Sequence, residues 1–220
     1  MIILDGKKTS SDIKDEIASE VKSITLSGDR PPHLAALIVG NDGASLTYVG
    51  SKVKACEKVG FDSTLLSLPE SISEQELLSK VYELNNDDKI DGYIVQLPLP
   101  NHIDTQKVLM AVDPKKDVDG FHPTNFGKMA LKLPTFISAT PNGIMELLKR
   151  YKVSTEGKHT VVIGRSDIVG KPISILMGLK TNPGNSTVTL AHSRTNNIED
   201  LIKQADLSLI HISEPTRHRL

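Results

Sequence analysis

Residues 33–59 read HLAALIVGNDGASLTYVGSKVKACEKV, and this stretch predicts a buried strand followed by a helix. The run from His33 to Val39 is apolar without alternation and is closed by a glycine, which is typical of a strand buried on both faces. From Ala44 to about Val59 apolar residues recur at helical spacing, so we expect a helix with one face on a core. The residues predicted to form that face are Leu46, Val49, Val53 and Cys56.

Tyr48 and Lys52 lie four residues apart on this predicted helix and therefore share a face, at the border of the buried side. Partial burial of a lysine lowers the pKa of its ammonium group toward the range where it exchanges protons near neutral pH. A tyrosine one turn earlier offers a flat ring to a planar ligand. Taken alone, such a pair is more often an ordinary amphipathic border, so its function depends on the rest of the chain.

The first half of the sequence alternates strand and helix signals. Two further short strands are expected, over Thr64–Leu68 and around Tyr93–Val95, with a helix between them that opens on a capping box of Ser73 and Glu76. This order predicts a parallel, helix-covered sheet whose functional groups lie at the carboxyl ends of its strands.

Polar residues occur where the third of these strands ends. Gln96 follows the strand directly and precedes Leu97-Pro98-Leu99-Pro100, a stiff loop in which one X-Pro bond can be cis. Further on, the loop 116–120 (KDVDG) carries two carboxylates, Asp117 and Asp119. On composition alone, a loop of this kind is more often simply a solvated connection.

A second α/β unit follows an irregular stretch over residues 121–138, where we place the domain junction. Thr140-Pro141-Asn142-Gly143 opens a helix with Pro141 expected at its first position. A strand ending at Ile163 then leads into residues 164–172 (GRSDIVGKP), a strand–turn–helix whose amides can face a phosphate. The turn lacks the pattern G-x-G-x-x-G, so it is a weak dinucleotide signal on its own.

The next predicted strand, Thr187–Ala191, is followed by His-Ser-Arg-Thr without an acidic residue. NAD-binding units often carry a carboxylate at this place, where it holds the ribose hydroxyls. Here Ser193 and Arg194, with Arg165 on the first turn, favour a ribose 2′-phosphate. The alternative is that these arginines are surface charges.

The composition indicates a cytoplasmic globular protein. The chain has 220 residues, with 26 basic and 27 acidic side chains and a net charge of -1, so it lacks the basic footprint of a nucleic-acid partner. Its single cysteine excludes an internal disulfide and fits a reducing compartment. We expect no membrane span, no signal peptide and no metal site.

Taken together, these stretches resemble the bacterial form of the bifunctional methylenetetrahydrofolate dehydrogenase/methenyltetrahydrofolate cyclohydrolase family. The resemblance covers residues 1 to 206 and implies two α/β domains. The first, residues 1–137, is a folate-binding domain with a parallel sheet, and the second, residues 138–220, is an incomplete Rossmann-like NADP-binding domain. The motifs that carry it are residues 41–45 through Tyr48, Lys52 and Ala55; residues 92–100; residues 116–120; Thr140, Pro141 and Gly143; and residues 164–172.

The resemblance also implies the role of each site residue. Lys52 is the essential acid/base, supported by Gln96; Tyr48 stacks on the folate ring, Asp119 binds the pterin, and Pro98 borders the substrate. Residues expected at NADP are Gly164, Arg165, Ser166, Ser193 and Thr140. The implied reactions belong to one-carbon metabolism: NADP⁺ oxidises 5,10-methylenetetrahydrofolate, and the methenyl product is hydrolysed to 10-formyltetrahydrofolate. The family is commonly a homodimer.

The sequence leaves two other functions open. The chain can be an inactive relative that acts as a binding or scaffold protein, although intact Tyr48, Lys52, Gln96 and Asp119 argue against it. It can also be a Rossmann-type oxidoreductase acting on another planar substrate.

From about residue 207 the sequence is expected to leave the family. Residues 207–210 predict one strand, whereas residues 211–220 (HISEPTRHRL) have no core periodicity. We therefore expect a truncated cofactor domain that leaves Val161, Ile163 and Val188 uncovered, with little or no dehydrogenase activity.

Overall fold

The computed structural model describes residues 3–210, and the chain divides into two compact units, one ending at Thr124 and the other beginning at Asn125. This division lies before residue 137, where we expected the first domain to end. It falls in the stretch expected to be irregular, which contains a helix, α5 (Pro123–Ala130). Within the described residues no helix is both long and apolar enough to cross a membrane.

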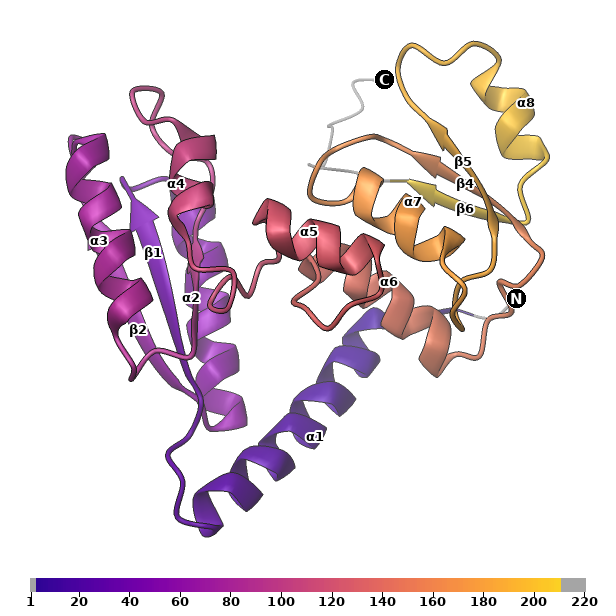
Figure 1. The fold of residues 1–220 in the computed structure, drawn as a ribbon. Coiled ribbons are helices and arrows are strands. Elements are labelled where there is room, and N and C mark those ends of the chain that lie inside the picture. Colours follow the sequence, from indigo (N-terminus) through magenta and orange to yellow (C-terminus); the bar gives the residue numbers. More distant parts are fainter. Residues whose placement is uncertain (1–2, 211–220) are drawn as a thin grey trace. The chain divides into compact units, whose positions relative to one another are not determined.

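The first unit is a three-stranded parallel sheet in the order β2-β1-β3 with helices on both faces (Figure 1). Its strands are β1 (His33–Val39), β2 (Asp62–Leu68) and β3 (Gly92–Val95). Its helices are α1 (Gly6–Leu26), α2 (Gly43–Val59), α3 (Glu74–Asn86) and α4 (Thr105–Ala111). The predicted parallel sheet and the capping box of Ser73 and Glu76 at the start of α3 are confirmed.

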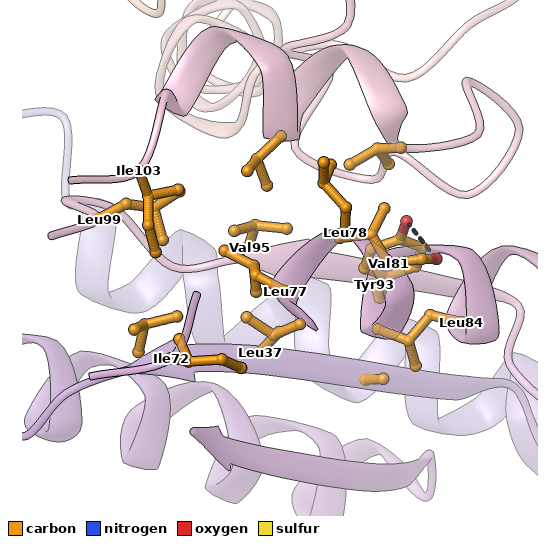
Figure 2. Close-up of a cluster of buried hydrophobic side chains, with 14 of the residues drawn as sticks. Leu37, Ile72, Leu77, Leu78, Val81, Leu84, Tyr93, Val95, Leu99 and Ile103 are labelled. Atoms are coloured by element: carbon orange, nitrogen blue, oxygen red, sulfur yellow. Dashed lines mark hydrogen bonds between the residues drawn. The ribbon is translucent and has the colours of Figure 1, made fainter. Parts of the chain in front are cut away.

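The central strand β1 is buried on both faces, as its continuous apolar sequence predicts. Leu37 and its alternate neighbours pack with α3 and α4 in the larger core cluster (Figure 2). Ile38 faces the other side, where it packs with Val49 of α2. Because alternate residues of a strand point to opposite faces, both sets must be apolar for the sheet to be covered twice.

Helix α2 is rotated relative to the prediction. Leu46, expected in the core, is 41% exposed, whereas Ser45 is buried. Val49 and Cys56 are buried as predicted, and the face that carries them also carries Lys52. Two stripes one residue apart satisfy the same helical spacing, so periodicity alone could not choose between them. The rotation places Lys52 on the buried side instead of at its border.

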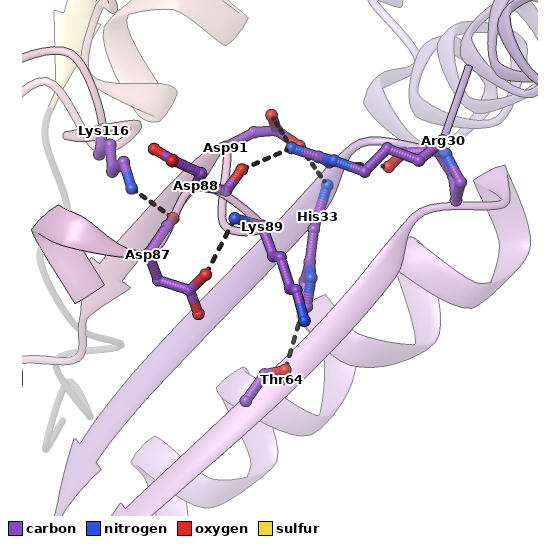
Figure 3. Close-up of polar contacts among 9 residues, drawn as sticks. Arg30, His33, Thr64, Asp87, Asp88, Lys89, Asp91 and Lys116 are labelled. Atoms are coloured by element: carbon purple, nitrogen blue, oxygen red, sulfur yellow. Dashed lines mark hydrogen bonds and ion pairs between the residues drawn. The ribbon is translucent and has the colours of Figure 1, made fainter. Parts of the chain in front are cut away.

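A polar clamp fastens the amino end of the first sheet (Figure 3). Arg30 donates to both oxygens of Asp91, with N–O distances of 2.6 and 2.9 Å, and Asp91 accepts from the backbone N–H of His33 at 2.7 Å. The ring Nε2 of His33 lies 2.9 Å from the Thr64 hydroxyl on β2. The clamp therefore joins all three strands at the amino end of the sheet.

The second unit contains another three-stranded parallel sheet, in the order β5-β4-β6. The strands are β4 (His159–Ile163), β5 (Thr187–Ala191) and β6 (Leu207–Ile210). Besides α5, the helices are α6 (Ala139–Arg150), α7 (Gly170–Gly178) and α8 (Ile198–Lys203). Leu148 of α6 and Ile173 of α7 pack on Val162 of β4, so these two helices cover one face of the sheet.

Two expectations for this unit need correction. Helix α6 begins at Ala139 instead of at Pro141. Pro141 is tolerated in the first turn of the helix because the first N–H groups of a helix have no hydrogen-bond partner within it. Val161, expected to be uncovered, is fully buried in the middle of a sheet to which the predicted strand β6 is added. Ile163 and Val188 are half-buried. The predicted tail over residues 211–220 lies outside the described residues.

Candidate active site

Lys52, Tyr48 and Asp119 meet beside the sheet of the first unit. The Lys52 ammonium lies 4.7 Å from the centre of the Tyr48 ring and 3.9 Å from Oδ1 of Asp119. The side chains of Lys52 and Asp119 are only 26% and 19% exposed, whereas Tyr48 is 55% exposed. The arrangement offers an open aromatic face next to a largely buried pair of opposite charges.

Burial works against the charge of both members of this pair. It lowers the pKa of Lys52 below its ordinary value, although the attraction of Asp119 acts in the opposite direction. It raises the pKa of Asp119, although Lys52 partly offsets that effect. A lysine whose pKa is lowered in this way can give and take protons closer to neutral pH than an exposed one.

The loop that carries Asp119 is fixed by residues whose contribution the sequence did not reveal. Asp117, the first carboxylate of the loop, is buried and accepts from the backbone N–H of His122 at 2.8 Å. Val118 fills the space beside Gly92, where an added Cβ would lie 2.2 Å from its Cγ1. A glycine at the start of a buried strand was the available signal, because such a glycine marks a close approach of another segment.

Gln96 and Pro98 lie at the carboxyl end of β3, as predicted. The Gln96 side chain donates to the Leu97 carbonyl at 2.7 Å, and within residues 3–210 the structure gives it no hydrogen bond to Lys52. The Leu97-Pro98 peptide is cis. Pro98 also borders a pocket of about 360 Å³ formed where the three strands end. The pocket is lined by Val39, Gly40, Asn41, Asp42, Glu70, Pro98, Leu99 and Pro100.

In the second unit, the turn between β4 and α7 brings two backbone segments unusually close. A Cβ added to Gly170 would lie 2.1 Å from the Gly164 carbonyl oxygen, and Gly164 itself has a φ of +119°. The Ser166 hydroxyl accepts from the N–H groups of Val169 and Gly170, each at 3.2 Å. A side chain at position 170 would not fit this close approach of β4 and α7, and backbone N–H groups at the start of a helix are the donors that a phosphate binds.

Arg165 and Ser193 follow neighbouring strands that end at the same level, because Ile163 of β4 is paired with Ala191 of β5. Both side chains are exposed, and among residues 3–210 no ion pair is given for Arg165 or for Arg194. Thr140 lies in the first turn of α6, which is tied to the β4–α7 turn by a 2.6 Å hydrogen bond from the Ser138 hydroxyl to the Ile168 carbonyl. These residues fit NADP, since an unpaired cation and hydroxyls suit its 2′-phosphate.

These observations define a class: a two-unit α/β protein with a largely buried lysine beside its first sheet and, in its second unit, a strand–turn–helix of the kind that suits a nucleotide. Comparison with known sequences identifies one family for both units. The catalytic domain described as tetrahydrofolate dehydrogenase/cyclohydrolase matches residues 4–119, and the NAD(P)-binding domain of the same family matches residues 138–216. The chain therefore belongs to the tetrahydrofolate dehydrogenase/cyclohydrolase family.

Individual relatives agree with this assignment. The bifunctional protein FolD of Flavobacterium johnsoniae is 68% identical over 215 residues, which cover 98% of this chain and 73% of that protein. The FolD of Flavobacterium psychrophilum is 67% identical over the same length. The predicted family is thereby confirmed. The second family match continues to residue 216, beyond residue 207, where we expected the resemblance to end.

Solved structures agree as well. The crystal structure of the bifunctional dehydrogenase/cyclohydrolase from Campylobacter jejuni is similar with a TM-score of 0.91 and 42% identity, over 96% of this chain and 73% of that one. The enzyme of Trypanosoma brucei, solved with NADP cofactor and an inhibitor, is similar with a TM-score of 0.89 and 32% identity. That comparison covers 97% of this chain and 72% of the other. The predicted two-domain α/β fold is thereby confirmed.

Proposed function

We propose that the chain oxidises 5,10-methylenetetrahydrofolate to the methenyl form with NADP⁺ and hydrolyses the methenyl form to 10-formyltetrahydrofolate. Membership of the family supports both activities and the use of NADP. The single observation on this chain that carries the proposal is the largely buried Lys52, held between the Tyr48 ring and the Asp119 carboxylate.

The first unit provides the folate site in this proposal. The exposed ring of Tyr48 stacks on the folate ring system, and Asp119 accepts hydrogen bonds from the pterin. Pro98 borders the substrate at the carboxyl end of the sheet. Gln96 supports Lys52 without locking the ammonium into its charged form, as a carboxylate would.

Lys52 performs the proton transfers of the hydrolytic step. Water adds to the cationic methenyl carbon and loses a proton, which leaves a neutral hydroxyl adduct. The bond from that carbon to one ring nitrogen then breaks as the hydroxyl becomes the formyl carbonyl; this nitrogen receives a proton, the hydroxyl proton leaves to solvent, and one proton is released overall. The lowered pKa of Lys52 lets one side chain accept the first proton and return it. Oxidation removes a hydride and leaves a cation, so it requires positioning more than a strong base.

The second unit provides the NADP site. When bound, the nicotinamide of NADP⁺ accepts the hydride. The turn of Gly164 and Ser166 binds the pyrophosphate, while Arg165 and Ser193 hold the ribose 2′-phosphate and Thr140 contributes a hydroxyl from the start of α6.

Two further features belong to the proposal: the protein is a homodimer, and it acts in the cytoplasm. The buried free thiol of Cys56 is typical of a reducing compartment. Light scattering on the purified protein at several concentrations tests the dimer, and a constant monomer mass contradicts it.

An absorbance assay tests the function. Incubation with methylenetetrahydrofolate and NADP⁺ is expected to produce reduced cofactor, and methenyltetrahydrofolate supplied alone is expected to lose its absorbance through hydrolysis. The two readings separate the steps, and production of reduced cofactor would contradict the sequence-based expectation of little or no dehydrogenase activity. Absence of both reactions contradicts the proposed function, and a requirement for another planar substrate favours the alternative oxidoreductase.

A further inference from the structure

The loop that leads to Asp119 is fastened to the far end of α3 by partly buried polar groups that the proposed mechanism does not use. The Asn85 side chain is at the centre of these contacts. Its amide nitrogen donates to the Ala111 carbonyl at 2.8 Å, and its Oδ1 accepts from the Asp113 N–H at 2.8 Å. One side chain therefore grips the end of α4 and the start of the following loop.

Tyr93 completes this arrangement from β3. Its hydroxyl donates to Oδ1 of Asn85 at 2.7 Å. The same hydroxyl lies 3.5 Å from the Val81 carbonyl (Figure 2). The Tyr93 side chain is 1% exposed, and burial raises the pKa of its phenol, so the hydroxyl stays protonated and available as a donor. Because Oδ1 accepts from two donors and the amide nitrogen donates to a carbonyl, the orientation of Asn85 is fixed.

The same segment is held at two more places before it reaches Asp119. The Lys116 ammonium donates to two carbonyls at the end of α3, that of Leu84 within the helix and that of Asp87 directly after it, at 3.0 and 2.7 Å. The Lys116 carbonyl in turn accepts from the Tyr93 N–H at 2.9 Å. Tyr93 thus contacts the segment through both its backbone and, by way of Asn85, its side chain.

We propose that Tyr93 and Asn85 are positioning residues for Asp119, which they hold at the folate site by fixing residues 111–116. This inference rests on the proposed role of Asp119 in binding the pterin. Neither residue touches the substrate. Their contribution is to keep the Asp119 carboxylate in place before the folate arrives, so that binding need not order the loop.

The sharpest test is Tyr93→Phe, which removes one hydroxyl and keeps the buried ring. We expect the KM for methenyltetrahydrofolate to rise by about 3- to 10-fold, the range that one lost hydrogen bond gives, with kcat nearly unchanged. Tyr82→Phe is the matched control, since Tyr82 lies on α3 but is 54% exposed. Leu77→Val is the control for stability, because it removes one methylene from the same core without touching the loop.

A double variant separates positioning from general destabilisation. In the Asp119→Asn background, Tyr93→Phe is expected to add little to the rise in KM, because the group that it positions has already been changed. Full additivity of the two effects, or an equal rise in KM in Leu77→Val, overturns the proposal.

Hydrogen exchange of the same variants tests the inference without relying on activity. Tyr93→Phe is expected to speed exchange in residues 111–121 by several-fold and to leave the amides of α2 unchanged. Uniform acceleration across the first unit overturns the proposal even when the enzyme assays succeed. If exchange is faster in this loop alone but the chain shows neither reaction, the structural inference is supported. The absence of both reactions would then contradict the proposed function.

Discussion

The two sheets are fastened in the same way at their amino ends but carry different chemistry at their carboxyl ends. His159 opens the central strand of the second sheet as His33 opens the first: its N–H donates to Asp206 at 2.9 Å and its Nε2 lies 2.9 Å from the Thr189 hydroxyl. Each aspartate immediately precedes one neighbouring strand, and each threonine lies on the other. The amino ends therefore maintain the fold in both units.

The carboxyl ends differ in how they treat positive charge. The first unit buries Lys52 against Asp119, where desolvation lowers the pKa of the lysine. The second unit leaves Arg165 exposed at the end of its central strand. A partly buried amine suits proton transfer, whereas an exposed guanidinium, which keeps its charge, suits an anion. The same kind of sheet thus carries a largely buried cation in the first unit and an exposed cation in the second.

The largest expected effect comes from removing the buried cation. Lys52→Met is expected to reduce hydrolysis of methenyltetrahydrofolate by about 10²- to 10⁴-fold, the usual contribution of a general acid–base group. The affinity for NADP⁺, measured by titration, is expected to stay unchanged, because the cofactor residues lie in the other unit. Lys54→Met, an exposed lysine on the same helix, is the control. Near-normal hydrolysis in Lys52→Met rejects the assignment.

Removal of the exposed cation is expected to have a smaller and more selective effect. Arg165→Ala is predicted to weaken NADP⁺ binding by about 10- to 100-fold, as expected for a charge-assisted hydrogen bond, and to affect NAD⁺ little. The reason is that only NADP⁺ has a 2′-phosphate. Lys203→Ala, an exposed lysine on α8, is the control. An equal loss for both cofactors, measured by titration, would instead place Arg165 at the pyrophosphate or in the maintenance of the fold.

Much of this fold could be predicted from the sequence because burial leaves a pattern. The apolar run from His33 to Val39 indicated a strand covered on both sides, and the order of strands and helices indicated a parallel sheet. The rotation of α2 could not be predicted, since stripes beginning at Ser45 or Leu46 have the same period. Helix α5 was not predicted because Pro123 and Pro134 indicated an irregular segment over residues 121–138.

The candidate site was only partly predictable for a different reason. The contact of Lys52 with Tyr48 follows from helical spacing within one element. The contact of Lys52 with Asp119 joins segments far apart in the chain, and its placement depends on Gly92 and Asn85. Such supporting residues carry no chemical signature of the site, so only the three-dimensional structure identifies them.

A change in the carboxylate beside Lys52 is expected to shift the pH dependence of hydrolysis. Asp119 raises the pKa of Lys52 while burial lowers it more strongly. Asp119→Asn removes only the raising influence, so the pKa of Lys52 falls further and the free amine appears at lower pH. The rising limb of kcat against pH is therefore expected to move to lower pH, measured at saturating folate. A shift to higher pH contradicts the pairing, and Glu57→Gln on the exposed side of α2 is expected to leave the limb in place.

The smallest effect concerns the two amino-end clamps under acid conditions. The Arg30 hydrogen bond lowers the pKa of Asp91, and the His159 N–H lowers the pKa of Asp206. A carboxyl with a lowered pKa binds fewer protons when folded, so its stabilisation is present above the ordinary value and is lost as pH falls through the folded one. Asp91→Asn is expected to cost at most about 1 kcal/mol at neutral pH, because its partner is half exposed, and to cost less as acid protonates the native carboxyl.

Asp206→Asn is expected to have a weaker effect of the same kind, since among the described residues the cation beside Asp206 is Lys158 at 3.6 Å and not a bidentate arginine. Hydrogen exchange of β1 and β4 amides, measured from neutral pH down to about the ordinary aspartate pKa, separates the two clamps. Each substitution should loosen its own sheet alone, with the larger change in β1, whereas Asp88→Asn should loosen neither, because Asp88 contributes only its carbonyl to Arg30. Equal effects at the two clamps would mean that the shared histidine and threonine carry the stabilisation and that the arginine adds nothing to it.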